Sequence, residues 1–76
     1  MLTAKLEYAS NKEFKIYEKD LFTCSDPIAI GHRLRFVSDK KTGFSLFPKH
    51  ITWKDDKILF ITHNSIYVFM IIKFKS

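Results

Sequence analysis

Two arginines stand two positions apart in the segment His32–Phe36, and each is followed by an apolar residue. In an extended strand, alternate side chains point to opposite faces, so the two guanidinium groups share one face and the two apolar side chains share the other. Guanidinium groups donate paired, charge-assisted hydrogen bonds to phosphates and carboxylates. The spacing therefore predicts a strand whose apolar face serves the core. Its basic face, with Arg33 and Arg35, suits a nucleic acid or an acidic protein surface.

Further cations and one aromatic ring belong to this expected surface. The segment 14–19 alternates as a strand would, with a lysine and a tyrosine on one face, and two lysines follow the arginines in the next turn. Proteins hold single-stranded nucleic acid with cations on the phosphates and aromatic rings stacked on the bases. The alternative is an ordinary solvated face whose cations pair with Glu13 and Glu18. The expected nucleic-acid surface consists of Arg33, Arg35, Lys40, Lys41, Lys15 and Tyr17.

Groups that can bind metals or move protons are present but widely spaced. Cys24, His32, His50 and His63 form none of the close ligand pairs of zinc sites, so we expect no metal site and no cofactor. A metal-independent ribonuclease needs a base beside cations that hold the phosphate. His32 next to the arginines is the first candidate for that base, and His50 is the second. These residue types are common in proteins, so the ribonuclease is only a minor hypothesis. We expect a protein that is not an enzyme.

The length and composition indicate a single small domain over residues 1–76. With 46% hydrophobic residues and only two glycines and two prolines, the chain has the composition of a globular domain. Its one cysteine cannot form an internal disulfide, and the N-terminus lacks the basic start and apolar run of a secretory signal. The most apolar stretch, 58–72, is interrupted by three polar residues, which argues against a membrane span. We therefore expect a cytoplasmic protein.

The net charge of +5 is unevenly distributed along the chain. Residues 1–20 carry four lysines and four acidic residues, whereas the remainder carries nine basic and four acidic residues. The whole excess of positive charge, nine minus four, therefore lies beyond residue 20. Such an excess attracts polyanions without identifying one.

The pattern of short apolar segments and turns predicts a mainly β fold. Period-two alternation occurs over residues 2–9, and turn residues separate short strands at 32–37, 44–47 and 50–53. Gly43 follows a polar turn and is expected to supply a positive φ there, while Gly31 is expected at a bulge or bend. We expect a small antiparallel barrel or strongly twisted sheet of five to seven short strands.

Residues 11–22 are compatible with two structures. The strand alternation of 14–19 competes with a capping-box pattern, Ser10 to Glu13, and with apolar residues at helical spacing. We favour the strand. The alternative is an α+β domain in which one N-terminal helix, about residues 11–22, packs on the sheet.

The C-terminal hairpin is apolar on both faces. If Asn64 and Ser65 form a two-residue turn, one face carries residues 59, 61, 66, 68, 70 and 72, and the other carries residues 58, 60, 67, 69 and 71. A small barrel has room inside for only one of these faces. The other face would then be an exposed interface or would be covered by the N-terminal segment. The expected interface consists of Phe60, Tyr67, Phe69 and Ile71.

These features predict a small non-catalytic binding module, a regulator or accessory factor, that binds nucleic acid through its basic strand face. The alternative is a protein-interaction or inhibitor module that forms a homodimer or docks a partner through the terminal hairpin.

Overall fold

The computed structural model describes residues 1–40 and 42–75 and contains, within them, seven β-strands and one short 3-10 helix. In chain order the elements are β1 (Leu2–Ala9), the 3-10 helix η1 (Lys12–Tyr17), β2 (Leu21–Cys24), β3 (Leu34–Ser38), β4 (Gly43–Leu46), β5 (His50–Lys54), β6 (Lys57–Ile61) and β7 (Ile66–Phe74).

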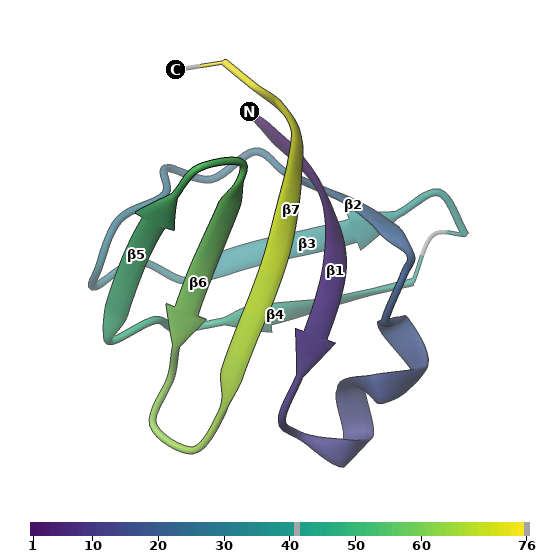
Figure 1. Ribbon diagram of the computed structural model, residues 1–76, viewed down its shortest axis with the longest axis horizontal. Coiled ribbons are helices and arrows are strands. Elements are labelled where there is room, and N and C mark those ends of the chain that lie inside the picture. The colour runs from purple at the N-terminus through teal and green to yellow at the C-terminus, as the bar shows by residue number, and fades with distance from the viewer. Residues whose placement is uncertain (41, 76) are drawn as a thin grey trace.

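All of these strands belong to one antiparallel sheet in the order β4-β3-β2-β1-β7-β6-β5. The sheet curls strongly, so that β3 and β4 lie behind β1, β6 and β7 in Figure 1. The two layers meet through aromatic rings, since Phe36 of β3 stacks on Phe69 of β7 with ring centroids 4.8 Å apart. Because β4 and β5 remain as the two edges, the fold is a half-barrel. The prediction of a mainly β domain with a strongly twisted sheet of five to seven strands is confirmed.

The concave face of the sheet holds the hydrophobic core. Leu2 and Leu6 of β1 are completely buried, and Thr3 and Lys5 on its other face are half-buried, as one-sided burial of a strand requires. At the centre, the ring of Phe36 packs against those of Phe44 and Phe69, with centroid separations of 5.4 and 4.8 Å. Full burial of one such side chain contributes about 1.5–3 kcal/mol. The other buried hydrophobic residues are Ala4, Ala9, Phe22, Cys24, Leu34, Leu46, Ile58, Phe60 and Tyr67.

Residues 11–22 form neither the strand that we favoured nor a helix of that length. Asn11 caps η1, because its side-chain oxygen accepts a hydrogen bond of 2.9 Å from the backbone N–H of Glu13. The helix ends after six residues, and β2 begins at Leu21. The strand prediction for 14–19 is therefore wrong. The alternative was right to place a helical segment against the sheet, but that helix has six residues where twelve were expected.

Aromatic packing explains why this segment becomes a 3-10 helix. Three residues complete one turn of such a helix, so Phe14 and Tyr17 lie on the same side. Both rings pack on Phe44, with centroid distances of 4.9 and 5.3 Å, and η1 thereby closes one end of the half-barrel (Figure 1).

Among the described residues, no helix has the length and apolar character needed to cross a membrane.

The register of the terminal hairpin differs from the prediction by two residues. Ile61 pairs with Ile66 and Leu59 pairs with Val68, so the loop spans 62–65 rather than only two residues. The backbone N–H of Thr62 donates to the carbonyl of Ser65 across this loop (2.9 Å). A shift of two residues leaves every side chain on the face that was predicted for it.

The prediction of which hairpin face is exposed was wrong. Phe60, Tyr67 and Phe69 are 0%, 3% and 0% exposed, and Ile71 is half-buried against the core. This face turns inward because the rings of β3 and β4 lie across the core from it: Phe36 contacts Phe60 edge-on at 5.9 Å in addition to stacking on Phe69. Phe60, Tyr67, Phe69 and Ile71 therefore line the core and do not form an exposed interface.

Gly43 serves a different purpose from the one predicted. It is the first residue of β4, pairs with Val37, and does not have a positive φ. A Cβ atom at this position would collide with the backbone carbonyl oxygen of Phe36. Glycine is therefore required here for close approach of two strands. Gly31 does lie in a turn and has a φ of 89°.

Candidate functional site

Arg35 lies on the outer face of β3, as predicted, but it already holds a carboxylate. Its Nε and Nη2 atoms donate to the two oxygens of Asp26 at 3.2 and 2.8 Å, and its backbone N–H donates to the same carboxylate at 2.8 Å. These hydrogen bonds lower the pKa of Asp26 to about 2, and those from the guanidinium group have the largest effect. Asp26 lies nine residues before Arg35, in the connection between β2 and β3. The pair ties the β2–β3 connection to β3 and partly neutralises the expected binding residue.

The other residues of the predicted nucleic-acid surface are dispersed. Arg33 is exposed just before β3, whereas Tyr17 packs edge-on against Phe22 inside the half-barrel, with centroids 5.8 Å apart. Lys40 lies past the other end of β3, 3.8 Å from the carboxylate of Asp20. Lys41 lies outside the described residues.

Lys15 belongs to a different part of the molecule from the arginines. Its Nζ donates to the carbonyl of Ala9 at 3.0 Å and lies 5.0 Å from the centroid of the Tyr8 ring. The pairings Leu2–Cys24 and Cys24–Phe36 place Arg35 beside the start of β1, whereas Ala9 is its last residue. At about 3.3 Å per residue, the two ends of β1 are more than about 20 Å apart. Lys15 and Tyr17 therefore do not stand beside the arginines.

The cysteine and histidines do not converge on a site in the part of the chain that the structure describes. No group of three His, Cys, Asp or Glu residues is arranged to hold a metal ion there. Cys24 is buried, and its thiol is 3.9 Å from the backbone carbonyl oxygen of Asp26. Burial raises the pKa of Cys24, so the thiol stays protonated near neutral pH.

The convex face of β1, β6 and β7 is turned toward the viewer in Figure 1, and its side chains form a continuous apolar surface. Leu59 opposes Val68, Val68 opposes Tyr8 on β1, and Ile61 opposes Ile66. Opposed residues of antiparallel strands share a face. Tyr8 and Ile66 are 47% and 42% exposed, and the others are half-buried. We call this surface the outer band, and it consists of Tyr8, Leu59, Ile61, Ile66, Val68 and Met70.

A row of lysines borders one end of the outer band. Lys54 pairs with Lys57, Lys57 pairs with Met70, and Met70 pairs with Lys5, which places these residues side by side across four strands. The described ion pairs involve Lys15, Arg35 and Lys40, and none involves the lysine row of Lys5, Lys54 and Lys57. These three ammonium groups are therefore available to an external anion.

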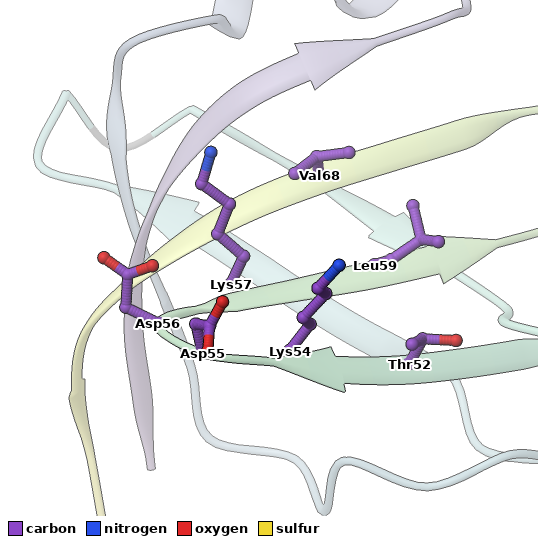
Figure 2. Close-up of a pocket in the computed structure, with 7 residues that line it drawn as sticks. All are labelled: Thr52, Lys54, Asp55, Asp56, Lys57, Leu59 and Val68. Carbon is purple, nitrogen blue, oxygen red and sulfur yellow. The ribbon is translucent and has the colours of Figure 1, made fainter.

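A surface depression of about 420 Å³ lies where the lysine row meets the outer band. Figure 2 shows Lys54 and Lys57 rising from the sheet on the same side as Leu59 and Val68, with Asp56 at the hairpin end. The depression is lined by Thr52, Lys54, Asp55, Asp56, Lys57, Leu59 and Val68.

The sequence predicted that both faces of the hairpin are apolar, but the face that carries the outer band was assigned to the core. Alternation alone gives the composition of each face and does not say which face turns inward.

Comparison of the chain with protein-family models, with curated proteins and with solved structures found no match.

Proposed function

We propose that this domain is a small non-catalytic binding module, a regulator or accessory factor, that docks a partner protein through the outer band. The observation that carries the proposal is the contiguous set of six apolar side chains on the open face of the sheet. The solvent-facing side of an antiparallel sheet ordinarily carries polar residues. Contiguous apolar surface on a small domain marks an interaction site.

A protein partner fits this surface better than a nucleic acid does. Apart from Tyr8, whose ring Lys15 approaches, the outer band is aliphatic and offers no rings on which bases could stack. The residues first expected to bind nucleic acid are spread over the molecule, and Arg35 is occupied by Asp26. Docking through the hairpin was the alternative sequence hypothesis, and the proposal moves that docking to the opposite face of the same strands.

Two matched substitutions test the proposal. Ile66→Glu introduces a charge into the outer band at a residue that is 42% exposed. Val37→Glu makes a similar change at a residue that is 53% exposed on β3, outside the band. Wild type and both variants would be immobilised, the proteins retained from an extract of the native host identified, and the affinity measured again with each purified partner.

We expect Ile66→Glu to weaken partner binding at least tenfold, which is about 1.4 kcal/mol, and Val37→Glu to leave it unchanged. Circular dichroism spectra of both variants should match the wild type, because both side chains are exposed. Equal binding by all three proteins would refute docking through the outer band. Binding of a single-stranded oligonucleotide that depends on Arg33 and Arg35 would replace the proposal with the nucleic-acid hypothesis.

A further inference from the structure

We infer that the outer band and the lysine row together receive an acidic amphipathic helix of the partner protein. This inference rests on the proposed function and adds the chemistry and shape of the docked segment. Its apolar side chains would cover the outer band, and its carboxylates would lie at the Met70 end, against Lys5, Lys54 and Lys57.

The charges on this face argue for carboxylates on the partner. Neighbouring strands are about 4.8 Å apart, so the backbones of Lys57 and Lys5 are separated by about 10 Å, with Met70 between them. Three cations so close together repel one another, and no described carboxylate pairs with them. Asp55 and Asp56 line the surface depression together with Lys54 and Lys57, but neither carboxylate lies within ion-pair distance of either lysine. A partner that carries carboxylates at this end of the outer band relieves the repulsion.

The backbone of the sheet argues for a helix rather than a strand. β1, β6 and β7 are flanked by other strands on both sides, so their N–H and C=O groups pair within the sheet. A segment lying on the face of these strands must therefore satisfy its own backbone hydrogen bonds, as a helix does. The outer band extends over Ile66 to Met70, about 13 Å at 3.3 Å per residue, which matches about nine residues of helix. Two to three turns with apolar residues at i, i+3, i+4 and i+7 would cover it.

The depression gives this helix a place to insert one side chain. Its volume of about 420 Å³ exceeds that of any single side chain, and Leu59 and Val68 line it beside Lys54 and Lys57. A second copy of this chain would bring another net charge of +5 to a face that is already basic.

Chemical-shift mapping with a designed probe tests the inference. The probe is a synthetic fourteen-residue helix with leucines on one face and glutamates beside them, added to the ¹⁵N-labelled domain. The matched peptide has glutamine in place of every glutamate. Parallel titrations use phosphatidylglycerol-containing vesicles and a twelve-nucleotide oligothymidine. The variant Lys5→Gln, Lys54→Gln, Lys57→Gln is compared with a control of the same charge, Lys12→Gln, Lys49→Gln, Lys75→Gln.

We expect the glutamate helix to shift amide signals of β1, β6 and β7 and to bind at least tenfold more tightly than the glutamine helix. The lysine-row variant should lose that advantage, and the control variant should keep it. Equal affinity for the two peptides, an unaffected lysine-row variant, or a larger response of the outer band to vesicles or oligothymidine would overturn the inference. If the glutamate helix fails while Ile66→Glu still weakens binding of the purified partner, docking through the outer band stands and the acidic helix is wrong. If Ile66→Glu is also without effect, the proposed function fails as well.

Discussion

Phe69→Ala is expected to remove a large part of the stability of this domain. Phe69 is completely buried, stacks on Phe36 at 4.8 Å and meets Phe60 edge-on at 5.7 Å. Truncation of a buried phenylalanine costs about 3–5 kcal/mol, because apolar contact is lost and a cavity remains. A chain of 76 residues has a total unfolding free energy of about 4–11 kcal/mol, at about 0.05–0.15 kcal/mol per residue. The variant therefore loses between about a quarter and all of this unfolding free energy.

Urea unfolding followed by circular dichroism and by the fluorescence of Trp53 measures this effect. With an m-value of about 1–2 kcal/mol/M, the midpoint of Phe69→Ala should fall by about 1.5–5 M. The control is Ile66→Ala on the same strand, which removes a side chain that is 42% exposed and should cost about 1 kcal/mol or less. If Phe69→Ala cost no more than Ile66→Ala, Phe69 would not be in the core and the assignment of the two hairpin faces would be wrong.

Three further predictions concern single sites. The pKa of Asp26 is lowered from its ordinary value of 3.8 to about 2, so its pairing with Arg35 stabilises the fold fully above pH 4 and loses this effect as the pH falls from about 4 to about 2. The stability difference between wild type and Asp26→Asn, measured by thermal unfolding, should shrink over that pH range, and a constant difference would contradict the pairing. Gly43→Ala should destabilise the domain by about 1–3 kcal/mol, because the new methyl group meets the backbone of Phe36; unchanged denaturant unfolding would refute this. Cys24, being buried with a raised pKa, should react with a thiol reagent at neutral pH far more slowly than in the unfolded chain, and equally fast labelling would show that the site is open.

The strands could be predicted because one-sided burial leaves a period-two pattern in the sequence. β1 is the clearest case, with Leu2, Ala4 and Leu6 buried and Thr3 and Lys5 between them half-buried. Residues 11–22 carried two overlapping patterns, and the choice between them depended on Phe44, which lies far along the chain and receives the rings of Phe14 and Tyr17. Local sequence contains no signal for such a distant partner.

The candidate site was harder to predict than the fold. The composition of each hairpin face followed from alternation, but the inward direction was set by Phe36 and Phe44 across the core. The pairing of Arg35 with Asp26 depends on the path of the β2–β3 connection, which spacing alone does not give. The lysine row joins Lys5 to Lys54 and Lys57 only because β1 pairs with β7, a contact between the two ends of the chain.

Cross-saturation on the ¹⁵N-labelled domain bound to its purified, unlabelled partner tests the central claim most directly. Docking through the outer band predicts the strongest loss of amide signal over Leu59–Ile61 and Ile66–Met70, with a weaker effect near Tyr8, which lie together on one face. Losses confined to β2, β3 and β4 around Arg35, with the signals of β6 and β7 unchanged, would contradict it.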